Sequence, residues 1–190
     1  KSLTVGDDFK FGKNQSGDVK DLKNYSSKGF FSLNIENKHC IDNTRISSTL
    51  IRDAITRNNF TLASKMLGRP YSISGKIIHG EKRGSKIGFP TANIKLKENV
   101  LLGGVYAVST YIDGKEYYAV ANIGYKPTFD GRKYLFEAHI FNLTANLYGK
   151  RLEFKIVAKI RDTKKFTSIE ELKESINHDI NSAKVIFKIK

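Results

Sequence analysis

The residues of this chain that could do chemistry concentrate between positions 75 and 93, where glycines alternate with basic side chains. Glycines let backbone N–H groups approach a polyphosphate closely, and lysine or arginine side chains supply the counter-charge. The stretch therefore predicts a loop that binds nucleotide phosphates. Its glycines are Gly75, Gly80, Gly84 and Gly88, and its basic residues include Lys82, Arg83 and Lys86.

Two oxygen-bearing side chains follow directly. Thr91 and Asn93 are two residues apart, so on a β-strand both would face the same side. Hydroxyl and carboxamide oxygens suit a hard cation such as Mg²⁺, which keeps waters and phosphate oxygens among its ligands. The pair predicts a metal site, although a strand threonine and a turn-starting asparagine explain the same spacing without chemistry.

The glycine pattern is not a Walker A loop. Its nearest frame, from Gly75 to Gly80, continues with Glu81 where that motif requires lysine and then serine or threonine. Four glycines within fourteen residues also occur in the turns of an ordinary β protein, with lysines solvating them. The glycines alone leave both explanations open.

Glu137 is the candidate general base. Alternation over residues 134–141 places Leu135, Glu137, His139 and Phe141 on one face, so a carboxylate lies in an otherwise apolar strand. A carboxylate can accept a hydroxyl proton as phosphoryl transfer proceeds. The alternative is a solvent-facing glutamate without a catalytic role, and we expect His139 to be a packing residue.

Two helices are expected before residue 70. Ser48 predicts the N-cap of a helix that runs to Ile55. Thr61 predicts the N-cap of a second helix, which ends at Leu67 because Gly68 follows.

The chain closes with an amphipathic helix. Ser168 and Glu171 form a capping box at its start. Apolar residues then recur on one helical face, which predicts that this face packs on the sheet. They are Ile169, Leu172, Ile176, Ile180, Ala183 and Phe187.

Beyond residue 70, alternating apolar residues predict strands. The strands follow one another without helices between them, with turn signals at residues 113–114, 130–131 and 148–149, which favours an antiparallel sheet or barrel. We expect one domain over residues 1–69 and a second over 70–190. The predicted strands are 71–78, 104–112, 115–122, 133–141 and 151–161.

Composition is compatible with an enzyme of the cytoplasm. The 190 residues, 39% of them hydrophobic, suffice for one domain and part of another. The single cysteine, Cys40, excludes a disulfide within this sequence and is expected to be an ordinary core or surface residue. No stretch reaches the roughly 18 to 20 apolar residues that span a bilayer, so we expect no membrane partner.

The net charge of +14 is diffuse. Residues 1–70 hold 12 lysines and arginines against 7 acidic residues, and residues 71–190 hold 21 against 12. A spread surplus of this kind usually solvates a surface, and here it would attract an anionic nucleotide. The alternative is a basic β-barrel that binds nucleic acid, with bases stacked on the nine tyrosines and twelve phenylalanines.

Several short motifs follow one another after residue 70. They are SISGKIIHGEKRG at 72–84, GFPTANI at 88–94, GVYAV at 104–108, ANIG at 121–124, KPTF at 126–129, FEAHI at 136–140, LYGK at 147–150 and KIRD at 159–162. Together they resemble the riboflavin kinase module of bacterial bifunctional riboflavin kinase/FMN adenylyltransferases. The resemblance implies an antiparallel Greek-key β-barrel with a C-terminal helix, which transfers the γ-phosphoryl group of ATP to riboflavin with the help of Mg²⁺.

The resemblance also implies roles for individual residues. Glu137 would be the base, and Thr91 and Asn93 the metal ligands. Arg161 and Phe166 would line the flavin, although a surface charge and a core contact explain them equally well. The flap over ATP would consist of Gly80, Gly84, Lys86 and Gly88.

The first third of the chain resembles the later part of the adenylyltransferase module of the same enzymes. The similar pieces are VGDDFKFGK at 5–13, SGD at 16–18 and RISSTLIR at 45–52. The resemblance implies a partial α/β nucleotidyltransferase segment, in which Arg45, Ser48, Thr49 and Arg52 belong to the adenylyltransferase site. The histidine pair of that site does not occur among the four histidines here, so we expect a fragment of a longer protein that does not convert FMN to FAD.

Overall fold

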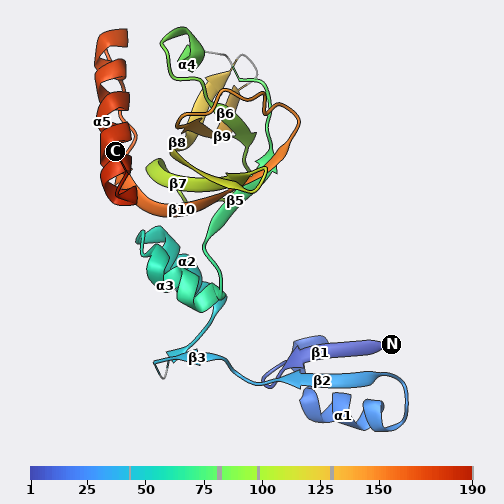
Figure 1. Ribbon diagram of the computed structural model, residues 1–190. Helices are drawn as coiled ribbons and strands as arrows, with labels where there is room; N and C mark the ends of the chain where they lie inside the picture. Colours follow the sequence, from blue (N-terminus) through green and yellow to red (C-terminus); the bar gives the residue numbers. More distant parts are fainter. Residues whose placement is uncertain (43, 81–82, 98, 129–130, 190) are drawn as a thin grey trace. The chain divides into compact units, whose positions relative to one another are not determined.

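The structure is a computed structural model that forms two compact units (Figure 1). The first unit is Lys1–Ser48 and the second is Thr49–Lys190. This division precedes the predicted boundary at residues 69–70, because the helices before that boundary share the hydrophobic core of the second unit. The assignment of domains to 1–69 and 70–190 stays a prediction. The structure describes residues 1–42, 44–80, 83–97, 99–128 and 131–189.

The first unit is a small α/β element. Strand β1 (Ser2–Gly6) pairs in parallel with β2 (Ser32–Glu36), and helix α1 (Val19–Ser27) connects them. Asp18 caps this helix, because its Oδ1 accepts hydrogen bonds from the backbone N–H groups of the first turn. The remaining elements are the 3-10 helix η1 (Lys13–Gln15) and the short antiparallel strands β3 (Cys40–Ile41) and β4 (Thr44–Arg45).

Two helices follow, α2 (Ser48–Thr56) and α3 (Phe60–Leu67), and both belong to the second unit from Thr49 onward. The prediction that Thr61 caps the second helix is wrong: Asn59 is the cap, and its Oδ1 accepts from Leu62 N at 3.0 Å. The earlier start places Phe60 inside the helix, where its ring stacks on Tyr71 and meets Tyr106 edge-on in the core. The predicted end of the helix is confirmed, because Gly68 adopts the left-handed conformation with φ of 68°.

Six antiparallel strands follow the order β5-β10-β7-β8-β9-β6. The strands β7, β8 and β9 form a meander, and β10 returns beside β7, which is a Greek key. The two end strands meet where Ile78 N donates to Asn93 O at 2.9 Å, so the barrel nearly closes, as predicted. The strands are β5 (Ser72–Lys76), β6 (Ala92–Lys95), β7 (Gly104–Ile112), β8 (Lys115–Thr128), β9 (Gly131–Ile140) and β10 (Arg151–Arg161).

Each of the five predicted strands corresponds to a strand of this barrel, which has six. Strands β7 and β10 have the predicted bounds, and the turn between β7 and β8 has positive φ at Asp113 and Gly114. Strand β6 was missed, because Ala92, Asn93 and Ile94 are all buried and show no alternation. The short helix α4 (Arg83–Lys86) was also missed, and of the turn at 130–131 the first residue, Asp130, lies outside the described residues.

Helix α5 (Ile169–Phe187) packs on the outer face of the barrel, as expected from its apolar pattern. Ala183 is fully buried against Val105, Ala107 and Val120 of β7 and β8. Ile169 does not belong to the buried face, because it lies in the first turn and is 56% exposed. Among the helices that the structure describes, none combines the length and the apolar character needed to traverse a bilayer.

Candidate active site

One cross-strand row carries most of the polar residues of interest. Arg161 of β10 pairs with Val105 of β7, which pairs with Asn122 of β8. Asn122 pairs in turn with Glu137 of β9, whose other neighbour is Asn93 of β6. Because paired residues share a face, the register places the candidate base directly between two carboxamides.

Glu137 lies on the outer face of the barrel, since its chain neighbours Phe136 and Ala138 are fully buried in the core. Its side chain is 23% exposed. Lys126 Nζ lies 2.9 Å from Glu137 Oε2, and Asn122 Nδ2 donates to the same oxygen at 3.4 Å. The carboxylate is therefore accessible and held in place by two neighbours on β8.

Asn93 is the buried polar residue beside this base, with only 4% of its surface exposed. Its Nδ2 donates to Thr91 O at 3.1 Å and to Thr91 Oγ1 at 3.3 Å. Its Oδ1 is buried and has no hydrogen-bond partner among the described residues. A buried acceptor left in this state costs about 1–3 kcal/mol unless a ligand satisfies it. The orphaned oxygen and the adjacent hydroxyl thus fit a hard cation.

Two glycines of the predicted phosphate loop pack against this pair. A Cβ at Gly80 would lie 2.7 Å from Asn93 Nδ2, so any larger residue would displace the carboxamide. A Cβ at Gly84 would lie 2.3 Å from Phe89 O, in a turn where Phe89 N donates to Gly84 O at 2.8 Å. Close approach therefore requires glycine at both positions.

The rest of the loop forms α4 and the turn that follows it. Lys86 ends α4 with its side chain exposed, and Gly88 has φ of 94°. The predicted counter-charge Lys82 lies outside the described residues, as does the side chain of Arg83. The loop returns to the barrel at Pro90, whose carbonyl oxygen lies 2.9 Å from His139 Nδ1. His139 thus contacts the loop backbone, in keeping with the packing role that we expected.

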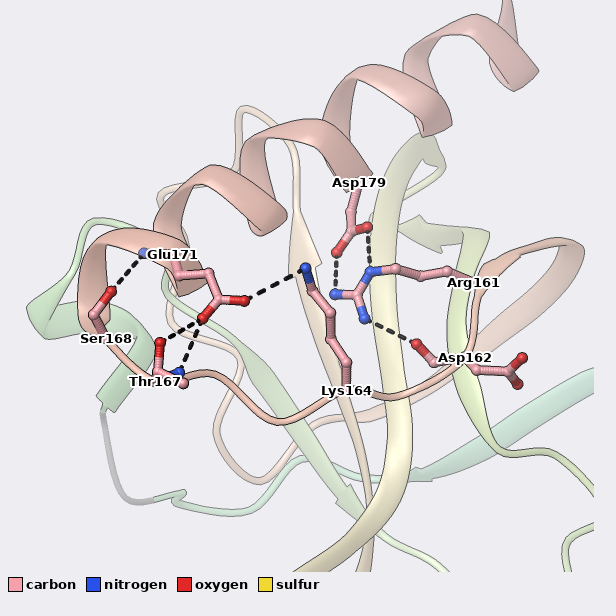
Figure 2. Close-up of polar contacts among 7 residues, drawn as sticks. All are labelled: Arg161, Asp162, Lys164, Thr167, Ser168, Glu171 and Asp179. Atoms are coloured by element: carbon pink, nitrogen blue, oxygen red, sulfur yellow. Dashed lines mark hydrogen bonds and ion pairs between the residues drawn. The ribbon is translucent and has the colours of Figure 1, made fainter.

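Arg161, at the other end of the row, is engaged by protein groups (Figure 2). Its Nε and Nη2 donate to the two carboxylate oxygens of Asp179 at 2.8 and 2.7 Å. Its Nη1 donates to Asp162 O at 2.9 Å. The side chain of Asp179 on α5 is only 3% exposed, so this bidentate ion pair ties the end of β10 to the C-terminal helix.

The segment between β10 and α5 is also fixed by polar contacts, which Figure 2 shows. Glu171 Oε2 accepts from Thr167 N at 2.9 Å and from Thr167 Oγ1 at 3.0 Å, and these hydrogen bonds lower the pKa of the Glu171 carboxyl. Only one of the two hydrogen bonds of the predicted capping box forms. Ser168 Oγ accepts from Glu171 N, whereas the Glu171 carboxylate accepts from Thr167 and not from Ser168 N. Phe166 lies under the Arg161 guanidinium, 5.8 Å from ring centroid to Cζ.

The predicted adenylyltransferase residues belong neither to the barrel strands nor to the phosphate loop. Arg45 Nη2 lies 2.6 Å from Asp8 Oδ2 in the first unit, and its hydrogen bond lowers the pKa of Asp8. Ser48, Thr49 and Arg52 are exposed residues of α2.

The structure brings together Gly80, Gly84, Thr91, Asn93 and Glu137. Arg161 and Phe166 lie apart from them, because three strand spacings of about 4.8 Å each separate Arg161 from Glu137 in the row.

Asn122 and Lys126 were not predicted as site residues, although both belong to motifs that carry the resemblance, ANIG and KPTF. Only the pairing of β8 with β9 places them beside Glu137. The one available signal was their spacing of four, which puts both on the same face of a strand.

Comparison with known families identifies two matching regions. The model of the Flavokinase family, described as riboflavin kinase, matches residues 67–187. The model described as FAD synthetase matches residues 1–50.

Curated relatives match nearly the whole chain. A bifunctional riboflavin kinase/FMN adenylyltransferase of Haemophilus influenzae is 42% identical over 98% of this chain and 61% of its own length. One of Buchnera aphidicola subsp. Schizaphis graminum is 41% identical over 100% of this chain and 62% of its own length. The chain therefore spans about three fifths of the length of these relatives.

A solved structure from Streptococcus pneumoniae, described as a macrolide-efflux protein, superposes with a TM-score of 0.74 and 35% identity. The superposition covers 94% of this chain and 58% of that one.

Proposed function

The chain belongs to the riboflavin kinase family, and from that membership we propose that it transfers the γ-phosphoryl group of ATP to the terminal ribityl hydroxyl of riboflavin. The products are FMN and ADP. The observation that carries the proposal is the pairing of Glu137 with Asn93, because it sets a carboxylate beside a buried carbonyl oxygen that no described residue satisfies.

Glu137 acts as the base in this proposal. A primary alcohol is a poor nucleophile, so its proton must leave as the new bond forms. The carboxylate accepts that proton while the hydroxyl oxygen bonds to the γ-phosphorus and the bond to the ADP oxygen breaks. The position of Glu137 on the outer face, where it is partly exposed, supports this role.

Asn93 Oδ1 and Thr91 Oγ1 would hold Mg²⁺. When bound, the ion would neutralise charge on the polyphosphate and on the transferred group. The fit rests on the orphaned Asn93 Oδ1, which a cation would satisfy. Gly80 and Gly84, which pack against this pair, would bring backbone N–H groups near the phosphates, with Lys86 and Gly88 in the same flap.

The flavin ring would lie toward Arg161 and Phe166. In the strand register Arg161 lies three strands away from Glu137, so the ribityl chain would extend between ring and base. Because the guanidinium donates hydrogen bonds to Asp179 and Asp162, Arg161 would contribute to flavin binding mainly through its contact with the Phe166 ring.

A direct assay tests the proposal. Riboflavin, ATP and Mg²⁺ are incubated with the purified chain, and FMN and ADP are separated chromatographically. We expect stoichiometric FMN and ADP, and we expect chelation of Mg²⁺ to abolish turnover without changing the circular dichroism spectrum. A folded sample that binds both substrates but forms no FMN would contradict the proposal.

The salt dependence of binding distinguishes a riboflavin kinase from the alternative, a barrel that binds nucleic acid. Binding of single-stranded nucleic acid through several phosphate contacts weakens steeply as salt increases, whereas affinity for an uncharged flavin ring changes little. We expect measurable riboflavin affinity at all salt concentrations. Tight, salt-sensitive nucleic-acid binding in place of riboflavin binding would favour the alternative.

The match of residues 1–50 to FAD synthetase supports a second proposal, that the full-length protein also adenylylates FMN. The 190 residues alone are expected to form no FAD from FMN and ATP, because the histidine pair implied for that site does not occur in them. Sustained release of FAD and pyrophosphate by this chain would contradict that expectation. A cytoplasmic location follows from the same proposal and stays a prediction.

A further inference from the structure

We propose that Lys126 is a positioning residue for phosphoryl transfer, which holds one oxygen of Glu137 so that the other oxygen accepts the substrate proton. The inference rests on the proposed function, because it assigns a partner to the proposed base. Asn122 assists Lys126 in this role.

The contacts of Glu137 are asymmetric. The Lys126 ammonium at 2.9 Å and the Asn122 carboxamide at 3.4 Å both reach Oε2. Neither contact involves Oε1, the oxygen that the described residues leave for a ligand. An ionised carboxylate accepts at both oxygens, so anchoring one of them fixes the orientation of the other.

The ion pair between Lys126 and Glu137 does not join residues that are opposite each other in the strand register. Lys126 lies opposite Lys133 in the register, and Glu137 is four residues farther along β9. Like charges that face each other across a sheet repel. The exposed Lys133 thus favours a conformation in which the Lys126 ammonium leans toward Glu137.

The position of Lys126 also suits the course of the reaction. As Glu137 takes the proton it loses its charge, while negative charge remains on the transferred phosphoryl group and on ADP. The lysine acts through the base, so its loss should lower kcat and leave the KM values for ATP and riboflavin nearly unchanged.

Steady-state kinetics of single variants provide the first test. We expect Lys126→Met to lower kcat about tenfold, with both KM values within about twofold of wild type. Lys126→Arg should retain kcat within about threefold, because it preserves the ion pair. Lys115→Met is the matched control: it removes the same charge from an exposed position of the same strand, β8, and should leave kcat unchanged.

A double-mutant cycle with Glu137→Gln provides the decisive test. In the Gln background, Lys126→Met should change the remaining kcat by less than about twofold, since the anchored carboxylate is gone. A tenfold loss in that background as well, or a loss expressed in KM, would show that Lys126 acts on the substrate or on the fold.

The same assays separate this inference from the proposed function. FMN formation by wild type together with an unchanged kcat in Lys126→Met overturns the role of Lys126 alone. Absence of FMN from wild type overturns the proposed function, and this inference with it.

Discussion

The two ends of the cross-strand row differ in how their polar groups are satisfied. At the β10 end, both oxygens of buried Asp179 accept from Arg161, whose third interaction is with Asp162 O. At the β6 end, buried Asn93 keeps an oxygen without a hydrogen bond to any described residue, and Glu137 is partly exposed. The same sheet thus presents one end whose protein contacts are complete and another that a ligand would complete.

The difference between the two ends separates residues that stabilise the fold from residues that we propose to take part in the reaction. A buried bidentate ion pair contributes rigidity and positions the elements that it joins. A buried, unsatisfied oxygen lowers stability, and the fold tolerates it where a ligand makes up the loss. Substitutions at the β6 end should therefore alter catalysis, and substitutions at the β10 end should alter stability and the placement of Phe166.

The largest expected effect lies at the β6 end. Glu137→Gln retains the size and hydrogen-bonding capacity of the side chain but removes the proton acceptor. We expect kcat to fall by roughly 10²-fold or more, with little change in MgATP affinity. Rapid-quench or steady-state assays of FMN formation measure the rate, and equilibrium titration measures the affinity. A variant with near-normal kcat would reduce Glu137 to a surface glutamate.

The β10 end should respond in stability. Asp179→Asn leaves the Arg161 guanidinium beside a neutral partner, and we expect the free energy of unfolding to fall by about 2 kcal/mol, less than for a fully buried pair because Arg161 is 24% exposed. Riboflavin affinity should weaken while MgATP affinity does not. Urea unfolding and ligand titrations measure these effects.

Glu174→Gln on α5 is the matched control for Asp179→Asn, because it removes a charge from an exposed position of the same helix. It should leave stability and both affinities unchanged. If Asp179→Asn lowers MgATP affinity as much as riboflavin affinity, the two ends of the row are not separable in the way that we infer.

The barrel was largely predictable from the sequence, because alternation and turn residues mark strands locally. Strands β7 and β10 have the predicted bounds. The errors arose where tertiary burial overrides local pattern. Strand β6 is short and buried throughout, and α3 begins at Phe60 because that ring enters the core.

The candidate site was predictable only in part. Glu137, Thr91 and Asn93 were selected by residue type and by resemblance, and their roles remain proposals. Asn122 and Lys126 could not be found without the pairing of β8 and β9, since nothing in a single strand indicates what lies opposite. The Arg161 and Asp179 pair likewise joins residues 18 positions apart, in a strand and a helix.

Thr91→Val tests the metal pair at the β6 end and should have a smaller effect than Glu137→Gln. It removes a hydroxyl that accepts from Asn93 Nδ2 but preserves the shape of the side chain. We expect roughly a tenfold loss, shared between MgATP affinity and kcat. Titration of Mg²⁺ in the activity assay should show a higher half-saturating concentration. A lower melting temperature with normal Mg²⁺ dependence would argue against the metal role.

The smallest expected effect concerns Glu171 at the start of α5. Hydrogen bonds from Thr167 hold the pKa of this carboxyl below its ordinary value of 4.5, so the folded state binds fewer protons there than the unfolded state. The stability that it adds is present above pH 4.5 and is lost as the pH falls through the lowered pKa. Glu171→Gln should therefore lower the urea midpoint slightly at neutral pH and converge with wild type in acid. Glu170→Gln removes the same charge from the same helical turn and should show no such convergence. If both variants follow one pH profile, helix-end charge rather than the Thr167 hydrogen bonds fixes this segment, and the β10 end is less rigidly organised than its contacts indicate.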